Sequence, residues 1–192
     1  MKALLVVDIQ NDFTEGGALG VTGGGQVARD VTAYLASHRG DYDLVLASRD
    51  WHDADNDNGG HFAVSGAPNF VDTWPVHCVA GTEGSEYHPD LDTSYVDIHI
   101  KKGQGEPSYS MFEGVSDDGR TVAEILGGHG ITEVDVVGIA TDHCVRASAL
   151  DALGAGQKVT VLTDLIAAVA PDTGEKALEE LAGRGAALQT SN

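Results

Sequence analysis

The chain has 192 residues, two cysteines and a formal net charge of −19, because 30 acidic residues outnumber 11 lysines and arginines. This length favours one well-buried domain over residues 1–192, and the negative charge disfavours nucleic acid and anionic membranes as partners. Two cysteines make no disulfide framework, and no apolar run reaches the roughly 20 residues of a membrane span. We therefore expect a cytoplasmic protein that is a monomer or a small homo-oligomer.

Short apolar runs alternate with helical patterns along the chain, which is typical of βαβ units. Val27, Val31 and Leu35 share one helical face, whereas Leu4–Val7 is continuously apolar, as in a parallel strand covered on both sides. The sequence therefore predicts an α/β fold with a doubly wound, mainly parallel sheet and helices on both faces. The expected strands are 3–8, 43–48, 95–100, 134–140, 158–164 and 186–190, and the expected helices are 26–38, 120–127, 144–153 and 173–181.

Residues 50–94 interrupt this alternation, because they are rich in Gly, Asp, Asn, Pro and His and show no sustained period. Long irregular excursions inside compact domains are usually functional or disordered. The aromatic and histidine content of this excursion favours a functional role.

Cys144 stands where the predicted strand 134–140 passes into the predicted helix 144–153. Unpaired N–H groups in the first turn of a helix favour a thiolate, so we expect a thiol pKa lowered from about 8.5 towards neutrality or below. The same N–H groups can hold an oxyanion. A buried cysteine that only fills space is the alternative, and on position alone it is the commoner fate.

Asp8 and Lys102 also follow predicted strands, and with Cys144 they form a candidate nucleophilic triad. Because ligands gather beyond the carboxyl ends of strands in open α/β sheets, these residues are expected at one edge. Burial of Asp8 behind apolar residues raises its pKa and suits it to general acid–base work. Lys102, rather than Lys101, continues the apolar face of its strand and is expected to stabilise the ionised forms of Asp8 and Cys144.

Asp50, His52, His61 and His77 form a second cluster of polar residues in and beside the irregular excursion. Three imidazoles and one carboxylate suit a borderline divalent ion such as Zn²⁺, Mn²⁺ or Fe²⁺. A calcium loop over residues 53–64 is the rival, but its glycine is one place late and its twelfth position is Val64 instead of Glu. A solvated acidic loop is the better interpretation of Asp53, Asp55 and Asp57.

The motifs, taken in order, resemble the nicotinamidase/pyrazinamidase branch of the isochorismatase-like cysteine hydrolases. The resemblance spans nearly the whole chain and depends on the order and spacing of several motifs that are weak individually. These motifs are VVDIQNDF, DWH followed by HF, WPVHC, KKG followed by SYSMFEG, and GIATDHCVRASALDA.

The resemblance implies a six-stranded parallel sheet and an amidase that converts nicotinamide to nicotinate and ammonia, with pyrazinamide as a further substrate. It assigns Asp8, Lys102 and Cys144 as the catalytic triad and one divalent metal ion (Zn, Fe or Mn) to Asp50, His52, His61 and His77. It also implies that Phe13, Trp74 and Tyr109 wall the ring pocket, that the N–H groups of Ala140 and Cys144 form an oxyanion hole, and that the Ile139–Ala140 peptide is cis. Because segment 53–60 is longer than usual in the family, His61 is the ligand that depends most on this loop.

The same fold also supports two rival functions. A relative could act on another amide or on a vinyl ether, although the vinyl ether reaction needs no cysteine. A non-catalytic metal-binding module is the rival from a different class, and the complete triad argues against it.

Overall fold

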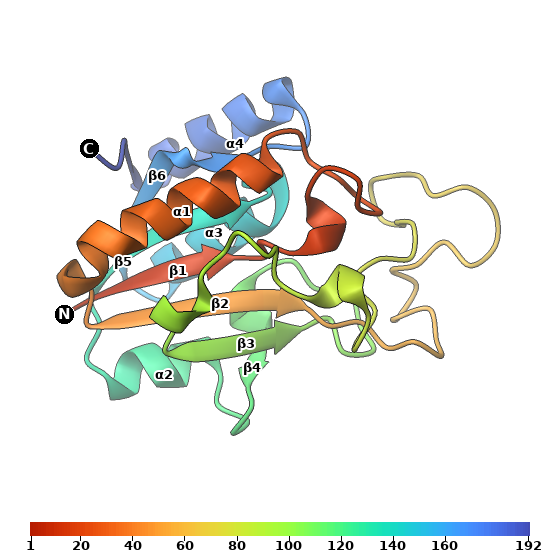
Figure 1. The fold of residues 1–192 in the computed structure, drawn as a ribbon, viewed down its shortest axis with the longest axis horizontal. Helices are drawn as coiled ribbons and strands as arrows, with labels where there is room; N and C mark the ends of the chain where they lie inside the picture. The colour runs from red at the N-terminus through yellow and green to blue at the C-terminus, as the bar shows by residue number, and fades with distance from the viewer.

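The computed structural model describes residues 1–192 as a seven-stranded sheet in the order β4-β3-β2-β1-β5-β6-β7 (Figure 1). All neighbouring strands are parallel except β3 and β4. The predicted α/β class is confirmed, and six strands are parallel as the resemblance implies, whereas β4 adds a short antiparallel edge. The strands are β1 (Lys2–Val7), β2 (Leu44–Asp50), β3 (Ile98–Lys102), β4 (Val115–Ser116), β5 (Glu133–Ile139), β6 (Lys158–Ala167) and β7 (Ala187–Gln189).

Helices cover both faces of the sheet. On one face, α1 (Gly24–His38) packs against residues such as Leu4 and Val6 of β1. On the other face, α2 (Val122–Gly128), α3 (Arg146–Gly154) and α4 (Pro171–Gly183) pack against Leu5 and its neighbours. Because successive side chains of a strand point to opposite faces, one apolar strand supplies both cores. None of these helices has both the length and the hydropathy needed to cross a bilayer.

The ends of two predicted elements differ from the structure in places that matter for the site. The predicted strand 95–100 is wrong at both ends: Thr93–Tyr95 forms a 3-10 turn in which Asp92 accepts from the Ser94 N–H, and β3 continues to Lys102. The predicted helix 144–153 begins later, because Thr141–Val145 forms a wider π-turn before α3. The two-residue strand β4 escaped prediction because it is too short to show a period.

The excursion between β2 and β3 contains only short 3-10 turns. Its first part lies beyond the carboxyl ends of the strands, at the right of Figure 1, and its last part returns across the sheet to the start of β3. Isolated bridges link His52 with Val79 and Phe62 with Trp74. Asn58 is buried, and its side-chain oxygen accepts from the N–H groups of Asp53 (2.8 Å) and Gly105 (3.1 Å). The other short helices are Asn11–Phe13, Arg39–Asp41, Glu83–Ser85 and Met111–Glu113.

Candidate active site

Asp8, Lys102 and Cys144 meet at the carboxyl ends of three strands. Asp8 follows β1 directly, Lys102 ends β3, and Cys144 lies in the π-turn after β5. The Lys102 Nζ lies 3.0 Å from Asp8 Oδ2 and 3.8 Å from Cys144 Sγ. Lys102 is 1% exposed and Cys144 is 7% exposed, so water has little access to the cluster.

The close approach of β1 and β5 brings the Cys144 turn against Asp8. A Cβ atom at Gly138 would lie 2.1 Å from the Val7 carbonyl oxygen, so only glycine permits this contact. The next peptide bond along the chain, Ile139–Ala140, is cis, as the resemblance implies. The strand pairing therefore places Asp8 and the Cys144 turn on adjacent strand ends.

Burial and charge set the protonation of the cluster. Burial raises the pKa of Asp8, as expected from the sequence. Burial by itself would lower the pKa of Lys102, but the charges of Asp50 and Asp8 raise it well above its ordinary value, so Lys102 stays charged. Asp8 Oδ1 also accepts a hydrogen bond from the Ser48 hydroxyl at 2.7 Å.

The expected low pKa of Cys144 is wrong. Burial raises the pKa of this thiol well above its ordinary value, and the nearby carboxylates of Asp8 and Asp50 raise it further, whereas Lys102 lowers it without offsetting these effects. The regular helix α3 also starts only at Arg146, so the sulfur is not in its first turn. At rest Cys144 is therefore a thiol, and it would need a neighbouring base to become a thiolate.

Asp50, His52, His61 and His77 lie together, close to the Lys102 side chain. One ring nitrogen from each histidine lies within 4.8 Å of one from each of the other two. Asp50 Oδ2 lies 3.6 Å from His52 Nε2 and 3.7 Å from His77 Nε2. Although burial acts to raise the pKa of Asp50, the charge of Lys102 and the nearby imidazoles of His52 and His77 hold it well below its ordinary value.

The donor set fits a divalent metal ion. The Nδ1 of His52 donates to the Gly103 carbonyl and the Nδ1 of His77 donates to the Pro75 carbonyl, both at 2.7 Å, so each Nε2 keeps a free lone pair. The buried His52 Nε2 and His61 Nδ1 have no hydrogen-bond partner. Burial lowers the pKa of His61 to about 4, helped by repulsion from His52 and His77 whenever these are protonated, which keeps the His61 imidazole neutral. These unpartnered nitrogens beside a carboxylate can hold one divalent ion.

The His52 ring can take this orientation because residue 103 is a glycine, whose missing side chain leaves room for it. Its φ is +75°, and a Cβ atom there would lie 2.5 Å from His52 Cε1. The sequence motif contains this glycine, but only the tertiary contact explains it.

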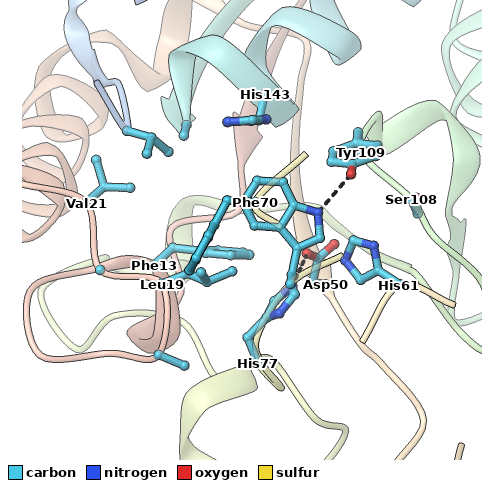
Figure 2. Close-up of a pocket in the computed structure, with 15 residues that line it drawn as sticks. Phe13, Leu19, Val21, Asp50, His61, Phe70, His77, Ser108, Tyr109 and His143 are labelled. Carbon is cyan, nitrogen blue, oxygen red and sulfur yellow. Dashed lines mark hydrogen bonds and ion pairs between the residues drawn. The ribbon is translucent and has the colours of Figure 1, made fainter. Parts of the chain in front are cut away.

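A pocket of about 440 Å³ opens beside these two clusters (Figure 2). Phe13, Trp74 and Tyr109, which the resemblance placed around the substrate ring, all line it. The Trp74 indole donates to the Tyr109 hydroxyl at 3.0 Å. His61, His77, Asp50 and Ala140 also line the pocket, so metal-type ligands and the Cys144 turn border the same space.

Sequence reasoning missed several pocket residues. His143 makes an edge contact with Trp74, with ring centroids 5.3 Å apart, and its place beside Cys144 was the only available signal. Phe70 and Val169 carried no signal, because each is a lone apolar residue in an irregular segment. Gln10 was also missed: its buried amide donates to the Asp50 carbonyl (2.9 Å) and accepts from the Asp50 N–H (2.8 Å).

The acidic loop lies outside the site. Asp55 and Asp57 are exposed, and neither belongs to the histidine cluster. This placement agrees with a solvated acidic loop.

Comparisons with known proteins agree with this geometry. Residues 2–192 match the family described as the isochorismatase domain. The chain is 50% identical to a nicotinamidase/pyrazinamidase of Mycobacterium tuberculosis over 94% of each chain. It is similar to the crystal structure of a pyrazinamidase of Pyrococcus horikoshii in complex with zinc, with a TM-score of 0.83, 39% identity and 98% of each chain covered. It is also similar to the PnC1 structure from L. infantum in complex with nicotinate, with a TM-score of 0.84, 34% identity, and 100% of this chain and 93% of that chain covered.

Proposed function

The chain belongs to the isochorismatase family, and we propose that it is an amidase that hydrolyses nicotinamide to nicotinate and ammonia through a thioester on Cys144. The observation that carries this proposal is the buried cluster of Asp8, Lys102 and Cys144 beside a pocket of about 440 Å³. Its relatives include nicotinamidases and pyrazinamidases, which supports a pyridine- or pyrazine-type carboxamide as the small-molecule substrate.

The first half of the reaction forms the thioester. Asp8 takes the proton of the Cys144 thiol, and the sulfur attacks the amide carbon. The N–H groups of Ala140 and Cys144 donate to the developing oxyanion. Asp8 then delivers the proton to the departing nitrogen, the C–N bond breaks and ammonia leaves. A carboxyl group with a raised pKa suits both proton transfers, because it can hold the proton between them.

The second half releases the product. Asp8 takes a proton from water, and the water oxygen attacks the thioester carbon. The C–S bond then breaks, Asp8 returns the proton to the Cys144 sulfur, and the carboxylic acid product loses its own proton to solvent and leaves as nicotinate. Lys102 keeps its charge throughout and stabilises the carboxylate of Asp8 and the thiolate of Cys144 in turn. Its burial between the two groups holds it within reach of both.

Asp50, His52, His61 and His77 would hold one divalent ion, which we propose to be Zn, Fe or Mn. When bound, this ion would fix the substrate through its ring nitrogen and so position the amide, a contribution that can reach several kcal/mol. Elemental analysis of the purified protein identifies the metal.

Phe13, Trp74 and Tyr109 are proposed to enclose the substrate ring. Their aromatic faces suit a flat heterocycle, and the Trp74–Tyr109 hydrogen bond fixes two of these walls relative to each other.

An ammonia-release assay tests the activity directly. Nicotinamide and pyrazinamide are expected to be hydrolysed, and benzamide, which lacks the ring nitrogen, is expected to be a poor substrate. Hydrolysis of benzamide at the rate of nicotinamide would contradict a role for the ring nitrogen. No release from any of these amides would leave the rival functions, a vinyl ether substrate or a non-catalytic module.

Asp8→Asn tests the proton transfers separately. An amide cannot accept the thiol proton, so turnover should fall by about 10²–10⁴. Without this base the Cys144 thiol keeps its proton, so its alkylation by iodoacetamide should slow as well. Alkylation at the parent rate would show that Asp8 is not the base of Cys144.

A cytoplasmic location is proposed on chemical grounds. Both cysteines are free thiols in the structure, and a nucleophilic thiol has to stay reduced to act. Fractionation of cells followed by an activity assay tests the compartment, and gel filtration tests whether the chain is a monomer or a small homo-oligomer.

A further inference from the structure

Phe70 lines the pocket but belongs neither to the proposed triad nor to the candidate metal ligands. Its side chain lines the same cavity as Phe13 and His143, and Figure 2 shows it directed into that hollow. Its ring packs edge-on against Trp74, with centroids 6.1 Å apart and planes at 84°. Nevertheless Phe70 is 57% exposed, so it forms the part of the wall that faces solvent.

The turn that carries Phe70 is built by side-chain hydrogen bonds. The Asn69 side-chain oxygen accepts from the N–H groups of Val71 (2.9 Å), Asp72 (2.8 Å) and Thr73 (3.0 Å). The Asn69 N–H donates to the Thr73 hydroxyl at 3.0 Å, and the Phe70 N–H donates to the Thr73 carbonyl at 3.0 Å. Asn69 and Thr73 therefore close the turn from both sides.

This turn holds Phe70 with a φ of +57°, in the left-handed region. Large non-glycine residues rarely adopt this conformation, and they keep it only where the surroundings impose it. The neighbouring Val71 is 70% exposed and does not line the pocket. The turn thus directs one large side chain to the pocket and its neighbour to solvent.

We propose that Phe70 determines substrate specificity: its ring closes the outer side of the pocket and restricts the site to amides of a single aromatic ring. The proposal rests on the proposed amidase function and adds the size class of the substrate. Edge-on contact with Trp74 fixes the Phe70 ring, and the Asn69 turn fixes its backbone. A fused two-ring carboxamide would have to displace this wall.

The test compares kcat/KM for nicotinamide and for quinoline-3-carboxamide, whose second ring is fused to the pyridine. In Phe70→Ala, the KM for nicotinamide should rise about twofold to tenfold through lost aromatic packing, with kcat within about twofold of the parent. The ratio of kcat/KM for the quinoline amide to that for nicotinamide should rise about tenfold or more. Val71→Ala is the matched control and should keep the parent values. An unchanged ratio in Phe70→Ala, or an equal rise in Val71→Ala, overturns the proposal.

A binding measurement separates this proposal from the amidase function. Calorimetry with nicotinate and quinoline-3-carboxylate needs no turnover, so the ratio of their dissociation constants reports the pocket even if no amide is hydrolysed. Phe70→Ala should shift this ratio towards the quinoline acid, and Asn69→Ala should shift it in the same direction, because the turn then no longer holds the ring. A parent ratio in Phe70→Ala refutes the size limit, and a parent ratio in Asn69→Ala refutes the role of the turn.

Discussion

Paired strands place Asp8 and Lys102, whereas an irregular segment places His61 and Trp74. The two strand residues stand at the ends of β1 and β3, whose registers are set by backbone hydrogen bonds to β2. The excursion is not held by paired strands of this kind. Hydrogen bonds from single side chains, such as those of Asn58 and Gln10, fix its backbone instead.

In the proposed function, the sheet edge and the excursion therefore have different tasks, the first in the reaction and the second in binding. The rigid sheet edge supports Asp8, Lys102 and Cys144, the groups proposed to move protons and form the covalent bond. The excursion supports three of the four candidate metal ligands and much of the ring pocket, whereas Asp50 ends β2. Changes in the length and side chains of the excursion can alter binding without disturbing the sheet. Substitutions at the sheet edge should therefore lower kcat, whereas those in the excursion should change metal content, KM or selectivity.

Removing the nucleophile should have the largest effect. Cys144→Ala is expected to lower turnover by on the order of 10⁴–10⁶, because no other group can form the thioester. Metal content and thermal unfolding should stay at parent values, since Cys144 has a small side chain and is not one of the candidate metal ligands. Activity within about tenfold of the parent would end the covalent hypothesis.

The two neighbouring lysines test whether strand register decides the chemistry. Lys102→Ala should lose about 10²–10³ in kcat or more, because it removes the charge that stabilises Asp8 and the thiolate. Lys101 is paired with Asp117 at the surface, at 2.9 Å, so Lys101→Ala should change activity little. Thermal unfolding checks that the Lys102 variant folds despite its unpaired carboxylates. Equal activity in both variants would remove Lys102 from the mechanism.

The histidines of the excursion test the metal site. His61→Ala should lower metal affinity by more than the roughly 10–100-fold expected for a residue outside the ligand shell. His88→Ala and His99→Ala should keep the parent metal content, because His88 lies near Asp90 and His99 bonds to Tyr87. Elemental analysis after dialysis gives the answer, and full occupancy in His61→Ala would mean that the ligand comes from elsewhere.

Asn58 should show the smallest effect, one confined to stability. Asn58→Ala leaves the N–H groups of Asp53 and Gly105 without their partner and should cost about 1–3 kcal/mol in the free energy of unfolding. For a chain of this size, each kcal/mol lowers Tm by roughly 2–4 °C. Asp55→Ala, at an exposed position of the same loop, should stay within about 0.5 kcal/mol. Equal Tm values for the two variants would show that the loop does not depend on Asn58.

Much of the sheet and the convergence of Asp8, Lys102 and Cys144 could be predicted, because both follow from short-range patterns. Continuous apolar runs identify buried strands, and alternation along residues 96–102 places Lys102 on the apolar face. The three residues then converge because parallel strands end at one edge. The pKa of Cys144 could not be predicted in this way, because it depends on burial and on carboxylates from two other strands.

The α/β class, the order of the elements and the residue types available for nucleophilic attack and metal binding all follow from the amino-acid sequence. The folded arrangement was needed to show that Gly103 makes room for the His52 ring, that Asn69 holds Phe70 against Trp74, and that Cys144 rests as a thiol. These features arise between segments that are distant in sequence or lack a period. Contacts of this kind depend on how the chain packs, so no local pattern records them.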